Sequence, residues 1–308
     1  MLRVAVPPPL AQQTARSRAS LKRRLERLYR AFDRSYLGTD PLAFVHRYDS
    51  EADQEIVGFL ASGLAFGNVL AIRGSVSALL AALGNSPHAF VDGFDPARNG
   101  RSLDGLYHRW VRSSDLVLLL ETLRRMRAEC GSIGSFFMAG YRAGDEDIGP
   151  SLASFSKRAR ELAESGTAGR GSVASFFPSP DSGSACKRLN LFLRWMVRDG
   201  DGLDLGLWPG VSRGQLVLPL DTHLVRLCRV LGLARRRTPG WKMAVEATRS
   251  LALLDPDDPV KYDFSLSRLG ILDLCLHGRE PVECRSCGVP RLTIRRRRSG
   301  KPELQAGR

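Results

Sequence analysis

The sequence has no long hydrophobic run, and this absence excludes the simplest kind of membrane protein. No window reaches the roughly 18 uncharged apolar residues that a membrane-spanning helix requires. The stretch MLRVAVPPPL is interrupted by three prolines before an apolar core develops, so it does not match a secretory signal. We therefore expect a cytoplasmic protein with no membrane partner.

Acidic and aromatic side chains are also scarce. The 308 residues include 32 Asp and Glu against 46 Lys and Arg, which gives a formal net charge of +14, and aromatic residues make up only 7%. A protein this basic usually has a polyanionic partner, and nucleic acid is the commonest. A genome composition that favours Arg is the alternative explanation. The charge thus favours nucleic acid as the partner without identifying a site.

No convincing strand pattern is present, whereas helical patterns run through most of the chain. Leu21, Leu25, Leu28 and Phe32 recur at the spacing of one helix face. Asn68 can cap a helix through VLAIRGSVSALLAAL, which ends at a glycine. The sequence therefore predicts an all-α fold, and we expect a monomer.

The organisation along the chain is predicted from the same helical patterns and from composition. We expect a flexible N-terminus over residues 1–18 and a helical domain over residues 19–290. A second helical lobe of that domain would span roughly residues 176–290. The stretch IRRRRSGKPELQAGR indicates a basic disordered tail over residues 291–308.

The stretch LVLPLDTHLVRLCRVLGL contains the first candidate for chemistry. Asp221 stands where the N-cap of a helix belongs, and its carboxylate can accept a backbone N–H bond. The helix dipole at that end also favours a negative charge. By position alone, Asp221 is a helix cap, Thr222 a first-turn residue and His223 a packing residue.

Lys187, in SACKRLNLFLRWMVR, is the second candidate. Ser182 or Ser184 can cap this helix, which places Lys187 in its first or second turn, and Gly183 permits close backbone approach. The dipole at a helix N-terminus disfavours a cation, and this setting suits an amine nucleophile. The alternative is a solvated lysine beside Arg188 in a phosphate-binding strip.

Several motifs carry a resemblance to known families. LPLDTHLVRLCRVLGL resembles the segment around the catalytic aspartate of helix-hairpin-helix DNA glycosylases of the endonuclease III type. LCLHGREPVECRSC is similar to the LHGR and CxxC at which that superfamily begins its iron–sulfur loop. SACKRLNLFLRWMVR, DLGLW, LPLDTHL and DPVKYDFSLSRLGI together resemble an uncharacterised bacterial family, domain of unknown function 2400.

The glycosylase resemblance implies a two-lobed helical fold with a divergent helix-hairpin-helix. Asp221 matches the catalytic aspartate, which stabilises the sugar cation as the base departs. Lys187 matches the lysine that attacks C1′ of a nucleotide flipped out of the duplex. Lys187 follows Gly183 by more residues than in that superfamily, and the spacing from Lys187 to Asp221 is longer.

The other predicted site residues follow from double-stranded DNA, the partner that the glycosylase resemblance implies. Trp208, in a loop, is the candidate for stacking on a base. Only Cys284 and Cys287 match the cluster pattern, and a cluster needs four thiolates, so we predict no cluster and no cofactor. That CxxC remains a weak zinc candidate. The predicted DNA-binding residues, which would give salt-dependent affinity where they are basic, are Gly183, Ser184, Arg188, Arg194, Arg226, Arg235 and Arg236.

Three functional hypotheses stay open on the sequence. The first is a base-excision DNA glycosylase, with or without AP lyase activity, that acts on a damaged base. The second is a DNA-binding helix-hairpin-helix module without chemistry. The third is a metal-dependent nuclease or hydrolase that uses the acidic stretch DPDDP, although alternating Asp and Pro residues are more typical of a helix break.

Overall fold

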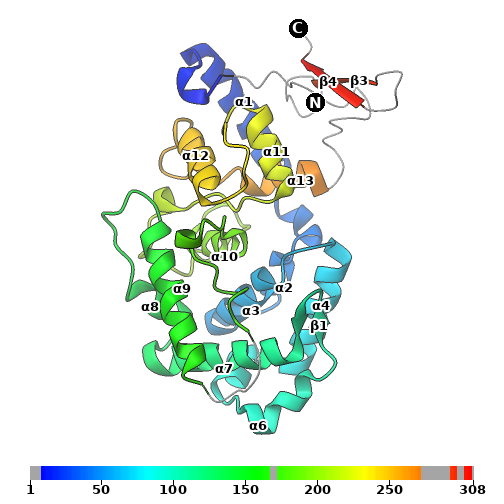
Figure 1. Cartoon of the computed structure of the whole chain (residues 1–308), viewed down its shortest axis with the longest axis vertical. Helices are drawn as coiled ribbons and strands as arrows, with labels where there is room; N and C mark the ends of the chain where they lie inside the picture. Colours follow the sequence, from blue (N-terminus) through cyan, green and yellow to red (C-terminus); the bar gives the residue numbers. More distant parts are fainter. Residues whose placement is uncertain (1–7, 167–171, 272–291, 297–301, 307–308) are drawn as a thin grey trace. The chain divides into compact units, whose positions relative to one another are not determined.

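The computed structural model describes residues 8–166, 172–271, 292–296 and 302–306, and it is mostly helical (Figure 1). The prediction of a helical fold is confirmed, because strands in these residues are confined to two short antiparallel pairs. The chain divides into two compact units. Unit 1 comprises Met1–Asp33 and Leu220–Arg308, and unit 2 comprises Arg34–Pro219.

This division differs from the predicted lobes, since the first helix of the chain belongs with the C-terminal segment. The physical reason is the apolar face of α1 (Ala15–Ala31), which packs against α13 (Asp263–Ile271). Leu25 and Leu28 of that face are buried. Within residues 1–18, where the sequence predicts a flexible N-terminus, Leu10 is fully buried and its backbone N–H donates to the carbonyl of Gly232 at 3.1 Å.

Unit 2 is built around α3, a helix that is buried along most of its length. Helix α3 packs against α10, and at Gly58 a Cβ atom would lie 2.8 Å from Cε of Met196. Phe59 packs edge-on against Phe192 of α10, with ring centroids 5.2 Å apart. The elements of unit 2 are α2 (Leu42–Val45), α3 (Glu51–Gly63), α4 (Val69–Leu83), α5 (Pro87–Asp92), α6 (Pro96–Asn99), β1 (Tyr107–His108), β2 (Val111–Arg112), α7 (Ser113–Cys130), α8 (Ile133–Met138), α9 (Gly149–Glu164) and α10 (Lys187–Val197).

The ends of α4 confirm the sequence signals in atomic detail. The Asn68 side chain accepts a hydrogen bond from the backbone N–H of Leu70 at 2.7 Å, which satisfies one of the free donors of the first turn. Gly84 ends the helix with φ +75°, a conformation that favours glycine. The cap and the stop together fix the length of α4.

Unit 1 combines α1 with the C-terminal helices. They are α11 (Thr222–Val230), α12 (Trp241–Ala252) and α13, and α11 also packs on α13. Strands β3 (Leu292–Arg296) and β4 (Pro302–Ala306) pair antiparallel, with Leu292 opposite Ala306. This pair lies within residues 291–308, where the sequence predicted a disordered tail.

A polar cluster fastens α1 to the segment that leads into α13. The Lys261 ammonium lies 2.8 Å from Oε1 of Glu26 and 2.5 Å from Oδ2 of Asp255. The Tyr262 hydroxyl donates to the same Glu26 oxygen at 2.7 Å. Burial alone would raise the pKa of Glu26 and of Asp255, but hydrogen bonds and charge from Lys261 outweigh it and lower both.

Replacing Lys261 by methionine tests this cluster. Because both carboxyl groups have a lower pKa in the folded than in the unfolded chain, their contribution is present above about pH 4.5 and lost as the pH falls through the folded values. We expect the variant to lose about 1 kcal/mol of unfolding free energy at neutral pH, and less below roughly pH 3. Urea unfolding of both proteins across the acid range measures this, and a difference independent of pH contradicts the assignment.

Candidate functional site

Asp221 is the N-cap of α11, as the sequence predicts. Its Oδ1 accepts a hydrogen bond from the backbone N–H of Leu224 at 2.7 Å, and its carboxylate is half-buried. Within the described part of the chain, the other carboxylate oxygen has no hydrogen-bond partner. Thr222 and His223 of the first turn are exposed, so His223 is not the packing residue that the sequence suggested. The site is therefore a fixed carboxylate at an open helix end.

Two substitutions separate the cap from the charge of Asp221. Asparagine caps a helix about as well as aspartate, whereas alanine lacks the acceptor and lowers stability by about 1 kcal/mol. We expect Asp221→Ala to lose that amount of unfolding free energy and Asp221→Asn to keep nearly the wild-type value. Chemical unfolding measures both variants, and equal losses would show that the hydrogen bond to Leu224 does not stabilise α11.

Lys187 is the first residue of α10, in agreement with its predicted place near a helix start. The N-cap is Cys186, in the left-handed conformation with φ +48°, rather than Ser182 or Ser184. The Lys187 amino group donates to the carbonyl oxygen of Ala65 at 2.8 Å, directly beyond the end of α3. Lys187 thus ties the start of α10 to the end of α3, and its amine must leave this carbonyl before it can act as a nucleophile.

Arg188 makes internal contacts of the same kind. Its guanidinium donates to the carbonyl oxygens of Gly63, at 2.7 Å, and of Ser175, and it lies 4.8 Å from the ring centroid of Phe66. Burial lowers the pKa of Arg188 to about 10. These contacts give Arg188 a role in fixing the loop after α3, in place of the predicted phosphate contact.

The loop before α10 contains the remaining predicted residues of that region. Gly183 is exposed and adopts the left-handed conformation with φ +77°, which favours glycine. Ser184 accepts a hydrogen bond through Oγ from the backbone N–H of Cys186 at 3.2 Å. Burial raises the pKa of the Cys186 thiol to about 12, which makes it an unreactive neighbour of Lys187.

The predicted phosphate contact of Arg194 is wrong, because only 1% of this residue is exposed. Its Nη2 lies 3.1 Å from Oδ1 of Asp204, and Arg198 pairs with the other oxygen of the same carboxylate. All three residues are buried. The helical pattern could not reveal this partner, because Asp204 lies in the loop after α10.

A buried charge network predicts a large loss of stability when one member is removed. Arg194→Met leaves Asp204 with a single guanidinium, and breaking a buried pair typically costs about 3–5 kcal/mol. We expect urea unfolding to show a loss of roughly 3 kcal/mol, with Arg235→Met, at an exposed position of unit 1, within about 0.5 kcal/mol of wild type. Equal stability of the two variants contradicts a role for Arg194 inside the fold.

Among the predicted DNA-binding arginines, the structure leaves Arg226, Arg235 and Arg236 exposed. The backbone N–H groups of Arg235 and Arg236 donate to the Glu246 carboxylate at 2.8 and 3.3 Å, and Nε of Arg236 lies 3.7 Å from it. These contacts hold the loop after α11 in place. The three arginines belong to the same unit as Asp221.

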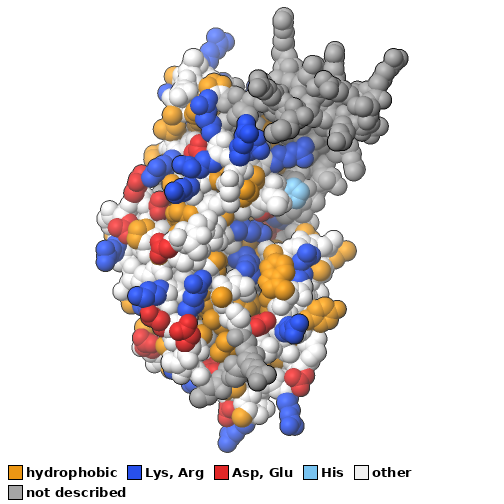
Figure 2. All heavy atoms as spheres, in the orientation of Figure 1, with side chains coloured by type: hydrophobic (Ala, Val, Ile, Leu, Met, Phe, Trp, Pro, Cys, Tyr) orange, Lys and Arg blue, Asp and Glu red, His pale blue; other side chains and the backbone are white. Residues whose placement is uncertain are grey.

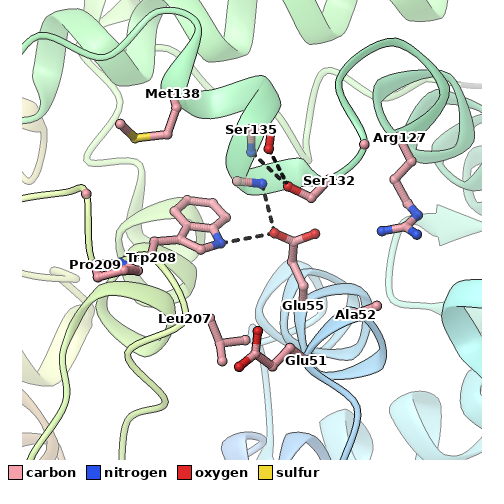
Figure 3. Close-up of a pocket in the computed structure, with 13 residues that line it drawn as sticks. Glu51, Ala52, Glu55, Arg127, Ser132, Ser135, Met138, Leu207, Trp208 and Pro209 are labelled. Atoms are coloured by element: carbon pink, nitrogen blue, oxygen red, sulfur yellow. Dashed lines mark hydrogen bonds between the residues drawn. The ribbon is translucent and has the colours of Figure 1, made fainter.

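Trp208 lies against a cavity of about 410 Å³ in unit 2 (Figure 3). The ring is 6% exposed, stacks on Phe137 with centroids 5.5 Å apart, and donates through Nε1 to Glu55 at 3.0 Å. Gly134 makes this packing possible, since a Cβ there would lie 2.6 Å from the indole nitrogen. The predicted role of Trp208 in base stacking is therefore corrected to a role in the core.

The cavity is lined by polar groups that already have internal partners. Glu55 accepts hydrogen bonds from the backbone N–H groups of Ile133 and Gly134, at 2.9 and 2.8 Å, as well as from Trp208. Burial raises the pKa of Glu55 in spite of these bonds. Arg127 is directed at Asp92, with Nε 2.6 Å from Oδ1. Glu55 thus joins α3 to the start of α8, and the cavity is a weaker site candidate than Asp221.

Sequence reasoning missed an exposed aromatic cluster beside the end of α3. Trp110, at the turn between β1 and β2, is 59% exposed and stacks on Phe66 with ring centroids 4.4 Å apart. The signal that could have identified it is the stretch LYHRWVR, in which aromatic and basic residues alternate without any acidic residue.

Two further predictions concern metals and membranes. Within the described residues, no three His, Cys, Asp or Glu side chains converge on a possible metal site. Cys284 and Cys287 lie outside the described residues. Asp255 of the DPDDP stretch forms an ion pair with Lys261. No helix in the described ranges has the length and hydropathy needed to cross a bilayer.

Comparisons with known proteins give one match. No curated protein and no solved structure matches the chain. The model of a family described as protein of unknown function, DUF2400, matches residues 40–272, which is well over half of the chain. This match includes α2 to α13, together with Lys187 and Asp221. The chain therefore belongs to the DUF2400 family.

Proposed function

We propose that this protein binds DNA and acts as a base-excision DNA glycosylase, with Asp221 as the charged group at the reacting sugar. The observation that carries the proposal is the geometry of Asp221. One carboxylate oxygen is fixed by the N–H of Leu224, the other has no partner among the described residues, and Thr222 and His223 beside it are exposed. The resemblance of LPLDTHL to the glycosylase segment supports the same role.

The proposed reaction is hydrolysis of the bond between the base and C1′. That bond breaks with its electron pair going to the departing base, which takes up a proton from solvent, and C1′ gains positive charge. A carboxylate held in place stabilises this charge without having to reorganise. Water then bonds to C1′ and transfers its proton to the carboxylate of Asp221, which can act as a general base.

Exposed arginines and lysines supply the proposed phosphate contacts. Besides Arg226, Arg235 and Arg236, α1 in the same unit has exposed cations, which include Lys22, Arg23, Arg27 and Arg30. Figure 2 shows Lys and Arg side chains in many places on the visible surface. Contacts of this kind give an affinity that falls steeply as salt is added.

A second candidate function is DNA binding without chemistry. The contacts of Lys187 and Arg188 favour it, because both side chains donate to backbone carbonyls within unit 2. A Schiff-base mechanism requires the Lys187 amine to leave Ala65, whereas hydrolysis assisted by Asp221 does not. Within the glycosylase proposal, hydrolysis is therefore preferred over AP lyase chemistry.

Base release from damaged duplexes tests the proposal. We expect wild-type protein to release the base from at least one duplex carrying 8-oxoguanine, uracil or thymine glycol. Asp221→Asn keeps the cap but loses the charge, and it should reduce the single-turnover rate at least a hundredfold, or roughly 3 kcal/mol. Equal release rates for wild type and variant contradict the role of Asp221.

Two further measurements separate the alternatives. Borohydride trapping on an abasic duplex should give no covalent complex, and a complex that disappears in Lys187→Gln would instead establish the lyase route. Salt-dependent binding without base release from any duplex would favour the non-catalytic module. No binding to any duplex at low salt would exclude both proposals.

A further inference from the structure

The surface of unit 2 bears an aromatic cluster that no other part of the described chain covers. We call it the hairpin patch and define it as Phe66, Tyr107, Arg109 and Trp110. Tyr107 is 74% exposed and Trp110 is 59% exposed. Figure 2 shows large hydrophobic side chains at the surface where Figure 1 labels α4 and β1, with basic side chains between them. Large aromatic rings left in water are unusual and mark interaction sites.

The patch is held rigidly in this exposed position. His108 is buried, and its two ring nitrogens lie 2.9 Å from Oγ of Ser75 and 2.8 Å from the carbonyl oxygen of Phe66. These bonds anchor the β1–β2 hairpin to α4 and to the loop after α3. Trp110 lies flat on Phe66, with 24° between the ring planes. Exposure of the indole is therefore built into the fold.

The turn of the hairpin is strained at Arg109, and a glycine at this position would avoid the strain. Arg109 has φ +54°, in the left-handed region where glycine is favoured. Its side chain lies across Gly67, where a Cβ atom would be 3.0 Å from Cδ of Arg109. Its guanidinium carbon is 5.9 Å from the Trp110 ring centroid. An arginine at a position whose backbone conformation suits glycine points to a function for the arginine side chain.

The two segments that form the patch carry cations only, while Asp115, at the start of α7, accepts the backbone N–H of Arg112 at 2.9 Å. Residues 66–75 and 107–112, which form the loop, the start of α4 and the hairpin, include three arginines and no Asp or Glu. Arg188 adds a guanidinium on the Phe66 ring. A ring with a free face, flanked by guanidinium groups, is the arrangement that binds unpaired bases together with their phosphates.

We propose that the hairpin patch binds unpaired bases in DNA, with one base stacked on Trp110 and the adjoining phosphate bound by Arg109. The inference rests on the proposed function, because it assigns a specific DNA structure, one with unpaired bases, to a protein proposed to act on DNA. Stacking on an aromatic ring is tolerant of sequence, since every base has a π face. An anionic lipid surface is the alternative partner for exposed aromatic and basic residues, and the test below includes it.

The test compares two fluorescently labelled duplexes of the same length, one fully paired and one with a short central mismatched bubble. We expect wild-type protein to prefer the bubble. Trp110→Ala should weaken binding to the bubble roughly tenfold, in line with the loss of one stacked base, and should change binding to the paired duplex far less. Trp110→Phe keeps a stacking ring and should retain most of the preference.

Leu253→Ala is the matched control, because Leu253 is a large apolar side chain of unit 1 with a similar exposure, 53%. It should leave both affinities unchanged. If wild type and Trp110→Ala bind the bubble with equal affinity, the hairpin patch does not bind unpaired bases, and the proposed function is unaffected. Binding of phosphatidylglycerol vesicles that requires Trp110, with DNA binding independent of it, assigns the patch to a membrane and also overturns the inference. Absence of all DNA binding at low salt contradicts the proposed function itself.

Discussion

The junction between the end of α3 and the start of α10 is the constraint on which much of unit 2 depends. Lys187 and Arg188, the first two residues of α10, donate to the carbonyl oxygens of Ala65 and Gly63. The last carbonyls of a helix lack partners within the helix, so Arg188 satisfies that of Gly63 at the end of α3, and a cation at this end interacts favourably with the dipole of α3. Lys187 binds the carbonyl of Ala65, in the loop that follows. At Gly58, the absence of a side chain lets the two helices approach closely.

The same junction fixes the loop that carries Phe66. Arg188 lies over the Phe66 ring, and the carbonyl of Phe66 in turn holds His108 of the hairpin. A chain of contacts therefore runs from the start of α10 to the exposed Trp110. The lysine that the sequence singles out as a nucleophile is, in the structure, part of the junction that supports the hairpin patch.

Local signals explain how much of the fold could be predicted from the sequence. The caps at Asn68 and Asp221 depend on residues two or three positions away, and both were predictable. Arg194 is buried because it pairs with Asp204, and Trp208 is buried where it binds Glu55. Local sequence does not identify these partners, because they meet only when the chain folds. The pairing of α1 with α13 has the same origin, because apolar periodicity identifies a buried face but not its partner.

The distribution of the basic residues bears on the proposed DNA partner more directly than the total charge does. Some arginines, such as Arg194 and Arg198, neutralise buried carboxylates and contribute nothing to a surface field. Others, such as Arg226 and Arg235, are exposed in the unit that holds Asp221. Surface cations attract phosphates over distances up to about 10 Å at moderate salt, whereas the single carboxylate of Asp221 opposes them locally.

The affinity of Asp221→Asn for a damaged duplex tests the central claim most directly, because it separates binding from chemistry in one residue. If Asp221 acts on the sugar, removing its charge relieves repulsion of the phosphates, and the variant should bind at least as tightly as wild type while it releases no base. The contradicting result is weaker DNA binding by Asp221→Asn when this variant is as stable to urea as wild type. Asp221 would then be a residue that recognises DNA rather than one that acts on the sugar.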